Sequence, residues 1–388
     1  MHLEEKMLTC LLFLTCIFGF GQAKVDRNST LLFVQIFFRH GDRAPLQLYP
    51  NDPNSEDIWP EGLGQLTVLG KKQHYEIGKY LRSMYDGFLT SDPNEVMVNS
   101  SEIDRCLMSA QANLASFYPP QGMWKFDEDI NWQPIPVYYI PTRKDKYLNF
   151  GSSCPRVFRD TLKAFESKEA QQLKQEHKDM LDNISRITGV QATEEFNSLL
   201  LYDALYIEKR YNLVIPEGIE PYWDEFQEFA LTALQWIYSS PNIIRLRAGP
   251  VLQHIIDNMN RKIAGYMPKR KVQIYSSHDL NLSTLLLALN TTKVVQPPYG
   301  ATLLIELHQM SDDTKAVRLL YLNSSYPEQE VEDPHLFFLD GCSEFCPLKQ
   351  LIESTRHVIP DDWNQECMLG NTSLIEQCKH FFEELYSK

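Results

Sequence analysis

Strand and helix patterns alternate at both ends of this 388-residue chain, and a long helical stretch separates the two ends. Residues 30–38 form an apolar run rich in β-branched and aromatic side chains, which predicts a buried strand. Residues 66–84 carry apolar side chains at spacings of three and four, which predicts an amphipathic helix. Residues 96–98 predict a short strand, and a further helix is expected to begin near Asp104. This alternation is typical of an α/β body built on a central sheet.

The middle of the chain has a different character. Residues 156–240 are rich in Lys, Glu and Gln and show helical periodicity, which breaks near Gly189 and again at residues 216–221. No strand pattern interrupts this stretch. We therefore expect an all-helical cap, inserted at residues 156–244, that covers one side of the sheet.

Strand patterns return after the helical stretch, at residues 272–275, 301–307 and 317–322. The last two are separated by a short polar segment and predict a hairpin. The catalytic core is therefore expected to be discontinuous, formed by residues 24–155 and 245–388.

The first residues resemble a targeting segment. Residues 7–20 form a 14-residue apolar run, which is too short to span a bilayer comfortably, and residues 21–23 have the small-x-small pattern of a cleavage site. We predict a signal peptide over residues 1–23, with a buried core helix as the alternative. The run is preceded by two glutamates and one lysine, so the prediction requires a start at Met7 or an atypical leader. No second long apolar run occurs, and we expect a soluble, secreted protein without a membrane anchor.

The charge of the chain limits its partners. The sequence has 37 Lys and Arg residues against 51 Asp and Glu residues, a formal net charge of -14. Binding of nucleic acid by bulk electrostatics is excluded, because it requires a positive face. A hydrophobic content of 43% is that of an ordinary globular protein. A local basic pocket for a small anion remains compatible with both numbers.

Six cysteines follow the predicted signal peptide, and an even number in a secreted chain predicts disulfides. Fifteen pairings exist if all six are bonded. Cys342 and Cys346 are close enough in sequence for a small loop bridge. A metal site is the alternative, but no histidine cluster accompanies these cysteines, and we expect no metal. The six are Cys106, Cys154, Cys342, Cys346, Cys367 and Cys378.

Seven N-glycosylation sequons occur, a density typical of a glycoprotein of the secretory pathway. Asn281 lies inside a motif described below and is expected to remain unmodified. Asn99 also fits the pattern. The sequons at which we predict glycosylation are Asn28, Asn183, Asn290, Asn323 and Asn371.

Two charged segments each follow a predicted strand. Residues 39–43, Arg-His-Gly-Asp-Arg, come after the first strand, and residues 276–279, Ser-Ser-His-Asp, come after the strand that begins at residue 272. Ligands in open α/β sheets bind at the carboxyl ends of the strands. Each segment alone has an ordinary structural interpretation as a solvated loop. Two such segments at strand ends, each with a histidine beside charged partners, indicate a functional site.

The residue types suit cleavage of a phosphate ester. Arg39 and Arg43 can bind the oxygens of a phosphate with bidentate geometry. A neutral His40 can attack phosphorus and form a phosphohistidine, and His278 can donate to the developing charge. Asp279 can protonate the leaving alkoxide. No metal or cofactor is needed, because cationic side chains stabilise the charge.

At these residues the chain resembles the histidine acid phosphatase family, its prostatic and lysosomal branch and the secreted insect venom enzymes. The motif Arg39-His40-Gly41-Asp42-Arg43-Ala-Pro with Ser277-His278-Asp279 carries the resemblance, and residues 64–70, 73–78, 104–109 and 132–136 extend it over most of the mature chain. The resemblance implies a mixed central sheet flanked by helices, with a phosphoglycerate mutase-like core. It implies an acid phosphatase that acts on small phosphate monoesters and is secreted, with a lysosome or a venom as other destinations.

The resemblance also implies the role of each residue. His40 is the nucleophile and Asp279 is the proton donor. Disulfides are implied between Cys154 and Cys367 and between Cys342 and Cys346, whereas Cys106 and Cys378 form either a third bridge or two buried thiols. The implied phosphate-binding residues are Arg39, Arg43, Arg105 and His278.

Some positions depart from the family pattern, and some alternatives stay open. Relatives usually have Arg-Ser-Thr-Asp where residues 99–102 are Asn-Ser-Ser-Glu, and often Thr where this chain has Cys106. Trp132 lies in a stretch that resembles the dimer contact of the relatives, with a core tryptophan as the alternative; a homodimer is thus an expected partner. A mutase-like transferase, a phytase and a binding protein that has lost catalysis are the other functional hypotheses.

Overall fold

The computed structural model describes residues 30–149, 154–238, 240–290, 296–371, 373, 375 and 376. The predicted signal peptide, Asn28 and Cys378 lie outside the described residues. None of the helices in the described part of the chain is long and apolar enough to cross a membrane.

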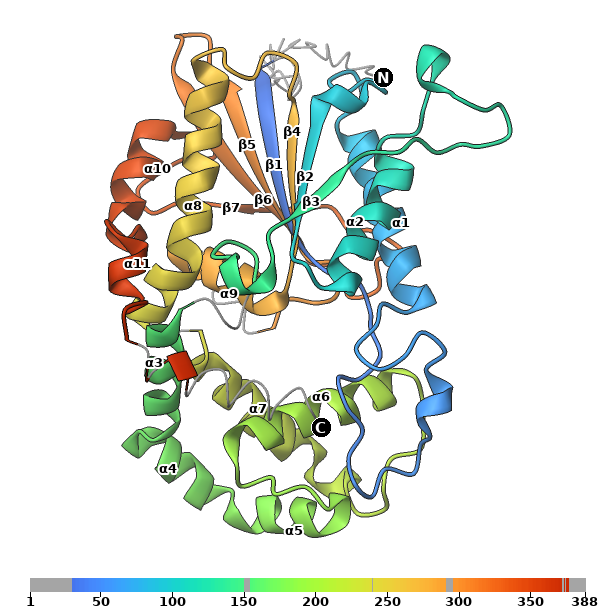
Figure 1. Cartoon of the computed structure of the whole chain (residues 1–388), viewed down its shortest axis with the longest axis vertical. Coiled ribbons are helices and arrows are strands. Elements are labelled where there is room, and N and C mark those ends of the chain that lie inside the picture. Colours follow the sequence, from blue (N-terminus) through green and yellow to red (C-terminus); the bar gives the residue numbers. More distant parts are fainter. Residues whose placement is uncertain are drawn as a thin grey trace, which may run out of the picture.

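The centre of the molecule is a mixed sheet in the order β3-β2-β4-β1-β5-β6-β7, with β8 paired to β6. β3, β2, β4 and β1 run parallel, whereas β5 and β6 form the predicted antiparallel hairpin beside β1. The mixed α/β fold is therefore confirmed (Figure 1). The strands are β1 (Leu31–Arg39), β2 (Val96–Ser100), β3 (Val137–Tyr139), β4 (Val272–Ser277), β5 (Thr302–Gln309), β6 (Lys315–Leu322), β7 (His335–Phe337) and β8 (Cys346–Pro347).

Helices pack on both faces of the sheet, which is why β1 is apolar along its whole length. Phe33 and Phe37 lie in the core on the side of α8 (Pro241–Ile263) and α9 (Asp279–Ala288), whereas Val34 and Ile36 lie in the core on the side of α1 and α2. Successive side chains of a strand point to opposite faces, and each face here requires apolar residues. α1 covers Val68–Met84 and α2 covers Asp104–Phe117.

Five helices follow β3 and lie below the carboxyl ends of the parallel strands in Figure 1. Met180, Leu205 and Phe226 lie in a separate apolar cluster of this region. α5 ends at Gly189, whose φ of 78° is accessible to glycine without strain, and this explains the predicted break. The helices are α3 (Pro155–Phe165), α4 (Lys168–Glu176), α5 (Lys178–Thr188), α6 (Glu195–Arg210) and α7 (Trp223–Trp236).

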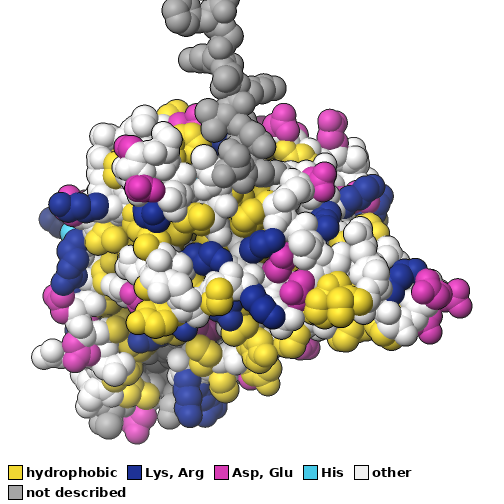
Figure 2. Space-filling model, turned by 90° about the horizontal axis from the view of Figure 1, so that it is seen from above, with side chains coloured by type: hydrophobic (Ala, Val, Ile, Leu, Met, Phe, Trp, Pro, Cys, Tyr) yellow, Lys and Arg dark blue, Asp and Glu magenta, His cyan; other side chains and the backbone are white. Residues whose placement is uncertain are grey.

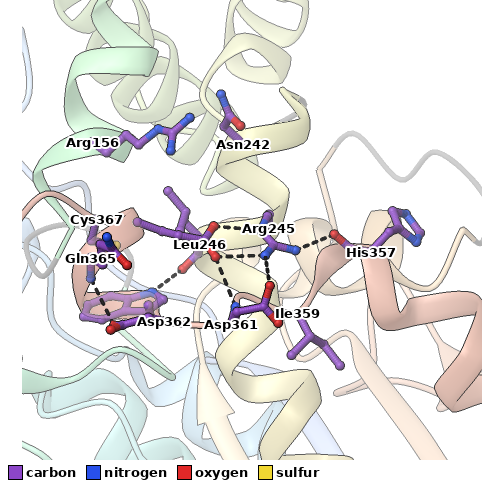
Figure 3. A network of polar contacts seen from close by, with 12 residues as sticks. Arg156, Asn242, Arg245, Leu246, His357, Ile359, Asp361, Asp362, Gln365 and Cys367 are labelled. Atoms are coloured by element: carbon purple, nitrogen blue, oxygen red, sulfur yellow. Dashed lines mark hydrogen bonds and ion pairs between the residues drawn. The ribbon is translucent and has the colours of Figure 1, made fainter.

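The C-terminal segment is fastened to α8 by a polar network (Figure 3). Arg245 donates to Glu366 from Nε at 2.7 Å and from Nη2 at 2.8 Å, and its Nη1 donates to the carbonyl of His357 at 2.7 Å. The indole of Trp363 donates to the carbonyl of Leu246 at 2.9 Å. These contacts hold residues 356–367 against the first turns of α8. α10 (Leu348–Thr355) directly precedes this segment, and α11 (Trp363–Glu366) lies within it.

The described part of the chain contains two disulfides, Cys154–Cys367 and Cys342–Cys346, with the pairing that the resemblance implied. The first joins the start of α3 to the end of α11 across 213 positions. Cys106 is buried, and within the described residues it is a free thiol.

The interpretation of Trp132 as a core residue is wrong. Its side chain is 39% exposed, and Met123 and Phe126 beside it in the chain are 86% and 60% exposed. The segment that contains these residues extends away from the sheet as the long loop at the upper right of Figure 1.

Candidate active site

The register of β1 and β4 brings the two charged segments together. The strands are parallel neighbours in which Arg39 lies opposite Ser277, so both leave the sheet at the same edge. The amide of His40 donates to the carbonyl of Ser277 at 2.9 Å. Residues 39–43 and 276–279, far apart in sequence, therefore form one site at the carboxyl ends of the strands.

A close approach between the first loop and α1 holds the site in place. A Cβ on Gly41 would lie 2.5 Å from the carbonyl oxygen of Gly70, and a Cβ on Gly70 would lie 2.2 Å from the carbonyl oxygen of Asp42. Gln73 accepts a hydrogen bond from the amide of Asp42 at 2.8 Å. The carboxylate of Asp42 accepts one from Thr67 at 2.7 Å. The glycines thus allow the first turn of α1 to fix the loop that follows His40.

His40 is buried, and its orientation is determined by its own backbone. Nδ1 lies 2.8 Å from the carbonyl oxygen of Gly41, which can only accept, so Nδ1 carries the proton and Nε2 keeps a lone pair. Burial, reinforced by the charges of Arg105 and Arg39, holds the pKa of His40 well below its ordinary value. The lowered pKa therefore favours the neutral imidazole.

Arg39 is held from three sides. Its Nη2 lies 2.8 Å from Oδ2 of Asp279, its Nη1 donates to the carbonyl of Pro297 at 2.5 Å, and its guanidinium lies 4.1 Å from the ring centroid of Tyr299. Such contacts restrict a side chain that otherwise has many rotamers. The guanidinium is thus presented beside His40 in one orientation.

Arg43 is paired with the helical region. It donates from Nη1 and Nη2 to the two carboxylate oxygens of Asp203, at 2.8 and 2.9 Å. The third arginine, Arg105, lies in the first turn of α2 and donates to the carbonyl of Gly64 at 3.3 Å. Burial, and next the charge of Arg105, lower the pKa of both His40 and His278, as expected for a cation near both rings.

His278 stands edge-on to the nucleophile candidate, with 5.6 Å between the ring centroids of His278 and His40. Its Nε2 lies 3.1 Å from the hydroxyl of Ser101. Burial, and next Arg105, lower the pKa of His278 to about 3. The thiol of Cys106 lies 3.7 Å from Nε2 of the same ring, and burial raises the pKa of that thiol to about 12. Both groups are therefore uncharged in this site.

Asp279 begins α9, and its Oδ1 accepts the amide of Leu280 at 2.8 Å. Burial alone would raise the pKa of this carboxyl, but the charges of Arg39 and Arg43 outweigh it and lower the pKa. These charges therefore favour Asp279 as a carboxylate.

The structure brings together all six residues that the sequence and the resemblance singled out. It adds two that were missed. Tyr299 follows Pro297 and Pro298 in a loop whose Gly300 has a φ of 75°, and this turn pattern was the available signal. Asp203 lies within the helical stretch, where nothing distinguishes it from other surface acids. No cluster of His, Cys, Asp and Glu fit to hold a metal occurs among the residues that the structure describes.

Comparison with known proteins gives one consistent answer. Residues 30–322 match the model of the histidine phosphatase superfamily, branch 2. Prostatic acid phosphatase of Bos taurus is 35% identical over 378 residues, which cover 95% of this chain and 94% of that protein. Lysosomal acid phosphatase of Homo sapiens is 35% identical over 352 residues, 89% of this chain and 82% of the relative.

Among solved structures, the phytase of Citrobacter braakii superposes with a TM-score of 0.65 at 18% identity, over 87% of this chain and 99% of the other. At that identity the likeness shows a common fold.

Proposed function

The chain belongs to the histidine phosphatase superfamily and is an acid phosphatase, and from this premise we propose that it hydrolyses phosphate monoesters through a covalent phosphohistidine on His40. The observation that carries the proposal is the hydrogen bond from Nδ1 of His40 to the carbonyl of Gly41. It leaves Nε2 as the nucleophile, and the lowered pKa favours the unprotonated form of that nitrogen.

The first step forms the bond between Nε2 and phosphorus while the bond from phosphorus to the ester oxygen breaks. Arg39, Arg43 and Arg105 bind the phosphate oxygens, and His278 completes the pocket. Three cations surround the transferring group, so the charge that develops in the transition state is stabilised without reorganisation.

Asp279 gives its proton to the leaving oxygen. The ion pair with Arg39 at 2.8 Å favours the ionised form of this carboxyl. A bound phosphate competes for the same guanidinium and adds negative charge nearby, and both effects raise the pKa of Asp279. Binding of the substrate therefore favours protonation of Asp279 under acidic conditions. In the second step water attacks phosphorus, Asp279 takes the proton from the water, and the bond to Nε2 breaks.

The test is hydrolysis of p-nitrophenyl phosphate between pH 4 and 8, combined with acid quench and intact mass measurement. We expect the wild type to gain the mass of one phosphoryl group and His40→Ala to lose both the adduct and turnover. His177→Ala, a variant at a histidine remote from the site in the loop between α4 and α5, is the matched control. Near-normal turnover by His40→Ala would refute the mechanism.

We further propose that the protein enters the secretory pathway, to be secreted or lysosomal, and carries N-glycans. The names of the relatives and the two disulfides support this route. Asn290 and Asn371 are exposed, whereas Asn281 is buried, which favours the unmodified state predicted for it. Expression in a eukaryotic secretory host with and without a glycan-removing amidase tests the proposal: loss of mass confirms occupied sequons. The remaining predicted sites are Asn28, Asn183 and Asn323.

We also propose a homodimer that uses the exposed loop around Trp132. The ring of Phe126 lies 6.4 Å from that of Trp132, and exposed apolar side chains on one loop are typical of a contact surface. Sedimentation of the wild type and of Trp132→Ser tests it, with a shift to the monomer expected for the variant.

A further inference from the structure

A second cavity lies on the face of the sheet that carries α8. Its volume is about 220 Å³, the space of about seven water molecules, and none of the six candidate catalytic residues lines it. α8 covers one part of this face, and residues 140–149 cross in front of β2 and β4 beside it (Figure 1). The cavity lies between these walls, with β2 and β4 as its floor.

The floor is polar, and its groups are already held. Gln273 donates to the side chain of Asn99 at 2.8 Å. Asn258, from α8, donates to the hydroxyl of Tyr275 at 3.0 Å, and that hydroxyl donates to Gln35 at 3.0 Å. Because each group has a partner, the floor needs no reorganisation to receive a ligand.

One wall is aromatic. The rings of Tyr147 and His254 lie 5.5 Å apart, and both line the cavity. Burial lowers the pKa of His254, Asp257 opposes the shift and Arg261 adds to it, and the net effect favours the neutral ring. The wall therefore offers apolar ring surface to a flat molecule.

Two arginines complete the lining without a counter-ion. Arg261 lies at the end of α8 and Arg270 precedes β4, and neither forms an ion pair with any residue the structure describes. Lys262 donates to the carbonyl of Arg270 at 2.6 Å and to that of Met267 at 3.2 Å, which folds the connection back toward the helix. Burial and the charge of Arg261 lower the pKa of Arg270. The two like charges are thus close, in a chain whose net charge is -14.

The one acidic side chain among the described lining residues, Asp145, is held by the backbone through its Oδ1. The carboxylate of Asp145 accepts the amides of Tyr147 and Leu148 at 2.8 and 3.0 Å, which fixes the crossing segment. Seen from above, Lys and Arg side chains stand among hydrophobic ones on this end of the molecule (Figure 2). Guanidinium groups without a counter-ion, next to an aromatic wall, are complementary to an aromatic molecule that carries an anionic group.

We propose that this cavity binds a small aromatic carboxylate, with its acid group against Arg261 and Arg270 and its ring against Tyr147 and His254. The volume admits a single ring with a short acid chain. The cavity is separate from the catalytic pocket. Inorganic phosphate bound in the catalytic pocket therefore leaves the cavity open.

The test is calorimetric titration of the full chain with phenylacetate, in the presence of saturating inorganic phosphate. We expect wild-type binding and at least a tenfold loss of affinity in the double variant Arg261→Gln/Arg270→Gln. The neutral analogue phenylacetamide should bind the wild type as weakly as phenylacetate binds the double variant. Absence of wild-type binding, or equal affinity for the double variant, overturns the proposal.

Two further variants separate the cavity from general electrostatics. Lys269→Gln removes a neighbouring exposed cation that does not line the cavity and should leave the affinity unchanged. Met97→Trp fills the cavity without changing charge and should abolish binding. All variants should hydrolyse p-nitrophenyl phosphate at the wild-type rate, which verifies that they fold. Retained binding by Met97→Trp would place the ligand elsewhere and refute the site.

Discussion

Arg43 and Asp203 form a bidentate ion pair that links the loop after β1 to α6, with the two donor–acceptor distances at 2.8 and 2.9 Å. The acid raises the pKa of the guanidinium against the opposing effect of burial. Arg43 is therefore oriented by a residue from the helical region, and this region takes part in presenting the guanidinium that we propose binds the phosphate.

Asp203→Asn should weaken this orientation. We expect KM for p-nitrophenyl phosphate to rise about tenfold, a loss of about 1.4 kcal/mol, with a smaller effect on kcat. Steady-state kinetics measure the split, and Asp224→Asn, at an exposed acid of α7, is the control. An unchanged or lower KM would mean that Asp203 only competes with the substrate for Arg43.

Asp279→Asn should separate substrates by their leaving groups. General acid catalysis is worth about 10²- to 10⁴-fold, and a poor leaving group needs most of it. The rate with an alkyl ester such as glycerol phosphate should therefore fall by that factor, whereas p-nitrophenyl phosphate, whose phenolate leaves readily, should lose much less. Measurements of kcat/KM on both esters, for the wild type and for Asp279→Asn, test this prediction. Equal losses would contradict the role of Asp279 as proton donor.

Glu208 should make the protein more stable in acid. Burial, followed by the neighbouring Asp52, raises the pKa of this carboxyl to about 8. The folded state then holds a proton that the unfolded chain releases near its ordinary pKa, so the free energy of unfolding falls as pH rises from about 4.5 to about 8. The slope is at most about 1.4 kcal/mol per pH unit.

Thermal unfolding between pH 5 and pH 8 measures this effect. Glu208→Gln should flatten the decline of Tm, since its amide does not titrate and can still accept from Tyr49, whose hydroxyl lies 2.9 Å from Oε2. Glu228→Gln, an exposed acid of α7, should follow the wild type. A wild-type Tm that does not fall over this range would contradict the prediction that the raised pKa of Glu208 makes stability depend on pH.

Gly70→Ala should damage the site without touching a charged residue. The new Cβ would lie 2.2 Å from the carbonyl oxygen of Asp42, so the loop after His40 must move. We expect a destabilisation of about 1–3 kcal/mol, as for other overpacked positions, together with a fall in kcat. Calorimetry and kinetics measure the two effects. Gly370→Ala, where the added carbon meets no atom within 4 Å, is the control, and a wild-type-like Gly70→Ala would refute the packing argument.

Much of the core could be predicted from the sequence, because short local patterns of apolar residues specify its longer strands and helices. An apolar run between residues 30 and 38 forms a strand wherever both faces are covered, and β1 covers Leu31–Arg39. The spacing of apolar residues similarly predicted α1. The short strands β3, β7 and β8 were not predicted, since two or three residues carry no periodicity and depend on a neighbouring strand for their hydrogen bonds.

The sequence by itself determined which chemistry is available: two histidines, two arginines and an aspartate in two segments that each follow a strand. Only the tertiary structure decided which other residues join them. Arg105 reaches the site because β2 lies beside β4, and Tyr299 reaches it because antiparallel β5 begins where β1 ends. Asp203 arrives from a helix with no local signal of function. Strand order and the docking of helices are long-range packing outcomes, and no pattern within a short segment specifies them.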